Sequence, residues 1–73
     1  MSVGKTLKKI RKEKGMTQVE FAKLLDMSRS FIGDIENERY IPNPHTVTKI
    51  SDKLGISVYY LTTGKKTLED ISE

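Results

Sequence analysis

Residues 17–37 read TQVEFAKLLDMSRSFIGDIEN, and this stretch decides the fold. Thr17, followed three residues later by Glu20, forms a capping-box pattern, which predicts that a helix begins here. Ser28 is a favourable N-cap for a second helix. Apolar residues at helical spacing give the two helices buried faces: Phe21, Ala22, Leu25, Met27, Ile32 and Ile35. The stretch therefore predicts two short helices joined by a tight turn.

Ala22 and Asp26 suit the geometry of such a pair. Two helices that cross steeply over a short turn bring their backbones close together, so the crossing needs a small side chain, and Ala22 supplies it. Asp26 follows the first helix and tolerates a left-handed backbone better than most residues do. These two residues favour a helix-turn-helix arrangement.

Three further helices flank this pair. Asn43 and Pro44 predict the N-cap and first position of a fourth helix, Gly15 and Gly55 are expected to end the first and fourth helices, and Ser57 opens a short fifth helix. The apolar residues with helical spacing are Val3, Leu7, Ile10, Val47, Ile50, Leu54, Val58 and Leu61. No strand-like alternation persists. We therefore expect an all-α domain of five helices over residues 1–61, followed by a tail, 62–73, that is frayed or contributes to dimerisation.

The length and composition restrict the class of protein. Seventy-three residues leave room for one domain, and the absence of Cys means that packed apolar faces must stabilise it. A chain without Cys suits a reducing compartment, and no apolar run is as long as a membrane span or a signal peptide requires. We therefore expect a cytoplasmic protein without a membrane partner.

Positive charge is concentrated near the start of the chain. The formal net charge is only +3, yet residues 5–14 hold Lys5, Lys8, Lys9, Arg11, Lys12 and Lys14 against Glu13 alone. A cluster of this kind attracts polyanions, although a solvated helix face is its commoner role. The cluster is therefore compatible with nucleic-acid binding without establishing it.

Catalysis has little support in the sequence. His45 is the only His, there is no Cys or Trp, and no phosphate-binding or metal-binding motif occurs. His45 stands next to Pro44 at the start of the expected fourth helix, where a surface or capping role is typical. We therefore expect neither an enzyme nor a cofactor or metal site.

The stretch 17–37 resembles the lambda-repressor and Cro-like (XRE-type) helix-turn-helix family. The resemblance is carried by the pair T-Q at 17–18, by Ala22, by the ending I-x-x-I-E-N at 32–37 and by L-G-I-S-x-x-x-L at 54–61. It extends over roughly residues 3–61. Asp26 is a departure, because the family most often has Gly at this position. The resemblance implies a compact five-helix DNA-binding domain with the helix-turn-helix at its second and third helices.

In this family the third helix enters the major groove and the second lies across the DNA backbone. The resemblance therefore implies that Arg29, Ser30, Gly33 and Asp34 face the bases. The Arg29 guanidinium fits guanine O6 and N7, and the Asp34 carboxylate can accept a hydrogen bond from a cytosine amino group. Gly33 would allow close approach. The residues implied to contact phosphates of the DNA backbone are Gln18, Ser28, Asn37, Arg39, Tyr40 and Lys9.

Two further sets of residues follow from the resemblance. Arg11 and Glu36 stand where the family has a structural ion pair between its first and third helices. An exposed apolar patch near Ile41, Val58, Tyr59 and Tyr60 is expected to form the dimer interface.

These residues predict a sequence-specific, double-stranded-DNA-binding transcriptional regulator, a repressor that binds a pseudo-palindromic operator as a homodimer. Such a protein would be associated with the nucleoid when it is bound to DNA, and a regulatory protein or peptide could be a further partner. The alternative is a protein-interaction module with the same fold, such as an antitoxin or the target of an anti-repressor.

Overall fold

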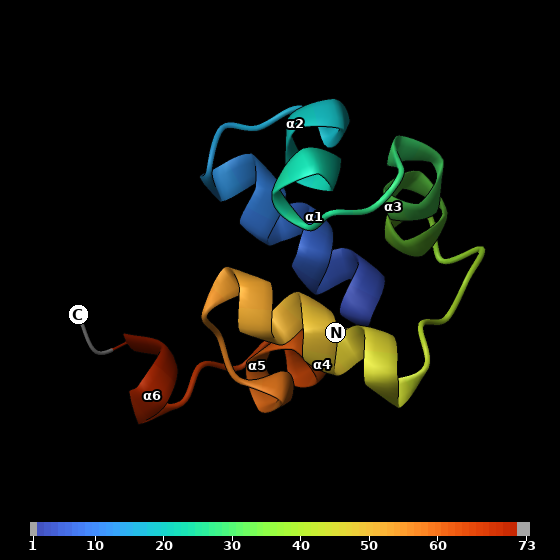
Figure 1. The fold of residues 1–73 in the computed structure, drawn as a ribbon. Coiled ribbons are helices and arrows are strands. Elements are labelled where there is room, and N and C mark those ends of the chain that lie inside the picture. Colours follow the sequence, from blue (N-terminus) through green and yellow to red (C-terminus); the bar gives the residue numbers. More distant parts are fainter. Residues whose placement is uncertain (1, 72–73) are drawn as a thin grey trace.

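Six helices make up the part of the chain that the computed structural model describes, residues 2–71 (Figure 1). They are α1 Val3–Glu13, α2 Gln18–Leu24, α3 Arg29–Glu36, α4 Pro44–Leu54, α5 Val58–Thr63 and α6 Leu68–Ile71. Residues 2–71 contain no strand, so the all-α prediction is confirmed. The number of helices is one larger than expected, because the tail forms α6.

Each of the first five helices begins at a hydroxyl or amide side chain. In every case the side-chain oxygen accepts a hydrogen bond from the backbone N–H three residues later, at a donor that the helix itself leaves unpaired. At Thr17 the box is complete, because Glu20 accepts from the Thr17 N–H at 2.9 Å. The expected caps are confirmed, and Ser2 is added to them; the full set is Ser2, Thr17, Ser28, Asn43 and Ser57.

The helices are arranged around α1 (Figure 1). The pair α2 and α3 lies on one side of α1, and α4 and α5 lie on the other side; α1 packs against both α3 and α5. The buried core joins all five: Leu7, Ile10, Phe21, Ala22, Leu25, Ile32, Ile35, Val47, Ile50, Tyr60 and Leu61. One face of α3 is therefore anchored in the core while the opposite face is left free.

Gly4 sets the distance between α1 and α3. A Cβ atom at this position would overlap the backbone carbonyl oxygen of Ile35 in α3. Only glycine lets the two helix backbones approach this closely. The sequence around Gly4 does not predict this role, because nothing in the local pattern shows which face of α1 meets another backbone.

Asp26 makes the turn between α2 and α3. Its φ is +56°, in the left-handed region, and the following N–H of Met27 donates to the carbonyl of Ala22 at 2.9 Å. Asp therefore takes the conformation for which the family favours Gly, as expected, and Ala22 is buried at the crossing.

The tail after residue 61 is docked on the domain. The fifth helix continues to Thr63, two residues beyond the expected boundary, and ends at Gly64. In α6, the Asp70 carboxylate accepts from the N–H of Ser57 at 2.6 Å and from its hydroxyl at 2.7 Å. Asp70 thus ties α6 to the start of α5, so within one chain residues 62–71 are held against the domain, and the contribution of the tail to dimerisation stays a prediction. Met1 and residues 72–73 lie outside the described residues.

Asp70 also accepts from the N–H and the hydroxyl of Thr67, both at 2.9 Å. Desolvation raises the pKa of the Asp70 carboxyl, but the hydrogen bonds from Ser57 and Thr67 lower it by more, so its pKa lies well below the ordinary value of 3.8. The ionised form of Asp70 is the one that holds α6 in place.

Candidate nucleic-acid interface

The free face of α3 carries the residues that were expected to contact bases. The helix buries Ile32, Ile35 and Glu36, so the opposite face of the helix points to solvent. Arg29 and Ser30 are exposed, while Gly33 and Asp34 are half-buried one turn further along. Because residues four apart share a helix face, Arg29 lies above Gly33 and Ser30 above Asp34. The four residues thus form one continuous outward surface.

Asp34 has a cationic neighbour within the chain. Its carboxylate lies 3.8 Å from a guanidinium nitrogen of Arg39, and its backbone carbonyl accepts from the N–H groups of Arg39 and Tyr40. The side chain of Arg39 is 72% exposed and that of Asp34 is 48% exposed, so the pair contributes only about 0–1 kcal/mol. Arg39 offsets the negative charge of Asp34 beside α3 and remains able to exchange this contact for another anion.

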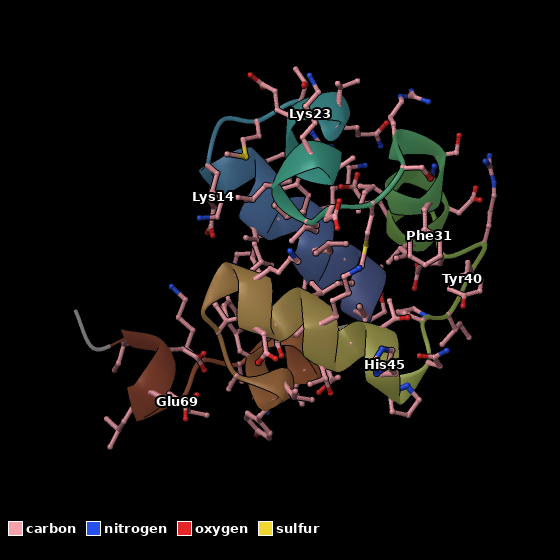
Figure 2. The ribbon with its side chains drawn as sticks, in the orientation of Figure 1. Lys14, Lys23, Phe31, Tyr40, His45 and Glu69 are labelled. Carbon is pink, nitrogen blue, oxygen red and sulfur yellow. The ribbon has the colours of Figure 1, made fainter. Side chains whose placement is uncertain are left out.

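Two aromatic rings hold the segment after α3 against the helix. Phe31 and Tyr40 lie with ring centroids 5.1 Å apart at 51°, and Figure 2 shows the two labelled rings next to each other. Tyr40 remains 40% exposed. This packing fixes residues 37–40 at the C-terminal end of α3, where Asn37 is exposed as the cap of the helix.

A buried polar network joins α1, α2 and α3. Arg11 donates from Nε to Glu36 Oε2 at 2.7 Å and from Nη2 to Oε1 at 3.1 Å, so the expected ion pair between them is present. Arg11 Nη1 also donates to the carbonyl of Met16 at 3.0 Å. Gln18 donates from Nε2 to Glu36 Oε1 at 3.1 Å. The Glu36 side chain is 1% exposed, so the network is closed to water on its carboxylate side.

The Gln18 contact was not foreseen from the sequence. Gln18 is expected to contact a phosphate, which stays a prediction, and its half-buried side chain uses one amide N–H within the protein. The spacing of Gln18 and Glu36 in the sequence gives no signal of the contact, because it depends on how α2 and α3 cross.

Gly33 is not required by packing within the domain. A Cβ atom there would meet only the two amide atoms of Gln18, each at 3.9 Å, which is ordinary van der Waals distance. Glycine inside a helix costs about 1 kcal/mol relative to alanine. The contacts within the chain offer no compensation for this cost.

The lysines of α1 differ in their distance from α3. Gly4 and Arg11 mark the stripe of α1 that meets α3. At 3.6 residues per turn, Lys8 lies about 60° from Arg11 around the helix, whereas Lys9 lies about 160° away. Lys8 is thus placed closer to the α3 side than Lys9, the residue expected to contact phosphate. Ser28, which is also expected to contact phosphate, is exposed and accepts a hydrogen bond from the Phe31 N–H as the N-cap of α3.

The expected single apolar patch is wrong in two respects. Tyr60 is only 3% exposed, because it lies with Leu61 on the face of α5 that packs into the core. Ile41 precedes α4 and is 86% exposed, whereas Val58 and Tyr59 begin α5 beyond the other end of α4 (Figure 1). The remaining exposed residues therefore form two separate patches, one at each end of α4.

Other kinds of site have little support within residues 2–71. This part of the chain holds no group of three or more His, Asp or Glu side chains that could bind a metal ion, and none of its helices is long and apolar enough to cross a membrane. His45 is exposed in the first turn of α4, where it is labelled in Figure 2.

Comparison with known proteins shows that most of this chain is similar to helix-turn-helix proteins. The sequence profile of a family described as helix-turn-helix matches residues 7–61. Among solved structures, the P22 c2 repressor protein in complex with a synthetic operator superposes with a TM-score of 0.76 at 25% sequence identity. That match covers 89% of this chain and 98% of the other.

Two relatives carry different kinds of name. The chain is 43% identical over 68 residues to the immunity repressor protein of Bacillus phage phi105, which covers 93% of this chain and 46% of the repressor. It is 36% identical over 58 residues to multiprotein-bridging factor 1 of Candida albicans, covering 80% of this chain and 38% of that protein. The chain thus spans about half or less of the length of either relative.

Proposed function

Because this chain belongs to the helix-turn-helix family, in its lambda-repressor and Cro-like form, we propose that it is a sequence-specific DNA-binding transcriptional regulator that acts as a repressor. The family consists of DNA-binding regulators and is not a family of enzymes. Its expected place is the cytoplasm, at the nucleoid when DNA is bound.

The observation that carries this proposal is the outward face of α3. Arg29 and Ser30 are exposed on a helix whose opposite face is buried, so α3 can enter a major groove without any rearrangement of the core. Arg29 would pair with guanine O6 and N7, a contact that contributes roughly 1–3 kcal/mol of discrimination. Ser30 and Asp34 would meet neighbouring base edges.

Contacts with the DNA backbone would surround α3. Asn37 and Arg39 at its C-terminal end and Gln18 at the start of α2 are the main candidates for phosphate contacts. Ser28 and Tyr40 are secondary candidates, and the lysines of α1 would add long-range attraction. Contacts of this kind position the protein without reading sequence.

We further propose that two copies bind a pseudo-palindromic operator with half-sites about 34 Å apart. A closed two-fold dimer uses the same patch of both subunits, so one of the two patches at the ends of α4 suffices. Ile41→Asp and Tyr59→Asp, compared by analytical ultracentrifugation and by binding to a full operator, would identify the interface. The dimer proposal fails if neither substitution changes the stoichiometry on DNA.

A protein-interaction module is the second candidate. The similarity to a protein named multiprotein-bridging factor supports it, as do the exposed side chains of Ile41, Val58 and Tyr59. In this case the polar surface of α3 would have no role in binding DNA.

Selection of bound duplexes from a random DNA pool tests the proposal, with Arg29→Ala as the paired variant. We expect the wild-type chain to enrich one motif and Arg29→Ala to lose preference at one base pair of it. Failure of the wild-type chain to enrich any motif would favour the interaction module.

A further inference from the structure

We infer that Glu36 is a positioning residue for DNA binding: it fixes the side-chain amide of Gln18 so that the remaining N–H of Gln18 is directed to a DNA phosphate. This inference rests on the proposed function. It gives the ion pair of Arg11 and Glu36 a second role, beyond holding α1 against α3.

The chemistry of the two groups sets the orientation of the amide. An ionised carboxylate can only accept hydrogen bonds, so Glu36 Oε1 must face the Nε2 end of Gln18, as the 3.1 Å contact shows. The Gln18 carbonyl oxygen and its second N–H must then point away from Glu36. Of the two ways in which the amide could lie, the network selects one.

The network also holds this orientation firmly. Glu36 is itself fixed by two hydrogen bonds from Arg11, and its side chain is almost wholly buried. Arg11 is anchored in turn on the carbonyl of Met16, in the turn that leads into α2. An amide already ordered in the free protein loses less conformational entropy when it binds, so it contributes more to affinity than a mobile one.

Gly33 leaves the amide accessible beside the recognition surface. Gly33, one turn before Glu36 on α3, carries no side chain, and an added Cβ there would lie 3.9 Å from both the nitrogen and the oxygen of the Gln18 amide. The Gln18 amide therefore lies next to the outward face of α3 that carries Arg29. This placement suits a phosphate at the edge of the groove that α3 enters.

A double-mutant cycle in DNA affinity tests this positioning role. The variants are Gln18→Met, which removes the amide and keeps the length of the side chain, Glu36→Gln, and the two combined. Val19→Ala truncates an exposed neutral neighbour on α2 and serves as the control. Binding is measured on a duplex that carries the selected motif and on a scrambled duplex of equal length, at a temperature where circular dichroism shows every variant folded.

We expect Gln18→Met to weaken binding about five- to tenfold on both duplexes, as the loss of a phosphate contact should. Glu36→Gln should weaken binding to a similar degree in the wild-type background and add almost nothing to Gln18→Met. Its loss of thermal stability, which comes through Arg11, should persist in both backgrounds. Val19→Ala should bind like the wild type.

Equal losses from Glu36→Gln in both backgrounds would overturn the inference, because Glu36 would then act only on the fold. A loss from Gln18→Met confined to the selected duplex would overturn the assignment to the DNA backbone. Should the wild-type chain bind no motif at all, the proposed function fails first and this inference with it.

A second measurement does not depend on the folding of any variant. The two side-chain amide protons of Gln18 give separate NMR signals in the wild-type protein. Addition of the duplex should shift the proton that is free of Glu36 more than the bonded one. No shift of either proton on saturation with DNA would contradict the inference.

Discussion

Glu36 and Asp70 each tie distant segments of this small domain together, and they do so in opposite ways. Glu36 joins α1, α2 and α3 from a position that is almost fully buried, with the guanidinium of Arg11 as its main partner. Asp70 joins α6 to the start of α5 through N–H and hydroxyl donors of Ser57 and Thr67. One carboxylate is balanced by a cation whose side chain is only 12% exposed, and the other by neutral donors at the surface.

This difference predicts how far through the structure the loss of contacts at Glu36 or at Asp70 lowers stability. A buried charge that loses its partner cannot recover water, so the cost falls on the whole fold. When the contacts of a half-exposed carboxylate are lost, water supplies the missing hydrogen bonds, so the effect stays local. The variants below test this contrast, beginning with the largest effect.

Arg11→Met should break the buried site. It keeps an apolar stem of similar length and removes the cation, leaving Glu36 buried with Gln18 alone. We expect the free energy of unfolding to fall by about 3–5 kcal/mol. Urea unfolding followed by circular dichroism measures this loss. Lys12→Met, an exposed substitution on the same helix, is the control, and a loss from Arg11→Met no larger than from the control would contradict the contrast.

Gly4→Ala should also disturb the contact of Arg11 with Glu36, by moving α1 relative to α3. The added methyl group overlaps the carbonyl oxygen of Ile35, so α1 must move away from α3 and Arg11 must move with it. Overpacking of this kind costs about 1–3 kcal/mol.

Gly33→Ala is the matched control on α3, where the same methyl group meets only ordinary contacts. It should leave stability unchanged or raise it by up to about 1 kcal/mol, the helix propensity of alanine over glycine. If thermal unfolding ranks the two substitutions the other way round, the close approach at Gly4 is not the constraint that we describe.

Local signals in the sequence were sufficient to predict most of the fold. The caps at Thr17, Ser28 and Asn43 and the apolar periodicity are properties of neighbouring residues, so the first five helices follow from them. The outward placement of Arg29 and Ser30 follows from the same periodicity. The ion pair of Arg11 and Glu36 was expected through the resemblance to the family alone.

What the sequence did not show depends on contacts between segments. The overlap at Gly4, the hydrogen bond from Gln18 to Glu36 and the docking of Asp70 each join residues from different elements. Tyr60 was placed on the surface because a six-residue helix has too few apolar positions to show which face is buried.

Asp70→Asn should affect the tail alone. Asparagine keeps one acceptor oxygen but places an NH₂ group against donors of Ser57 or Thr67, so part of the docking is lost. We expect faster amide hydrogen exchange in residues 67–71 and little change in the Tm of the domain. Hydrogen exchange followed by NMR measures both regions in one sample. A global loss of stability comparable to that of Arg11→Met would remove the contrast between the two carboxylates.

The smallest expected effect is the dependence of tail docking on pH. The pKa of Asp70 is lower in the docked tail than its ordinary value of 3.8, so the undocked tail binds more protons at low pH. Docking is therefore at full strength above about pH 5 and weakens progressively as the pH falls through 4 and below. Amide exchange and chemical shifts of residues 67–71 between pH 6 and pH 3, corrected for intrinsic exchange, should show this weakening in the wild type. They should show a much flatter profile in Asp70→Asn, and equal profiles for the two proteins would mean that a group other than Asp70 governs the tail.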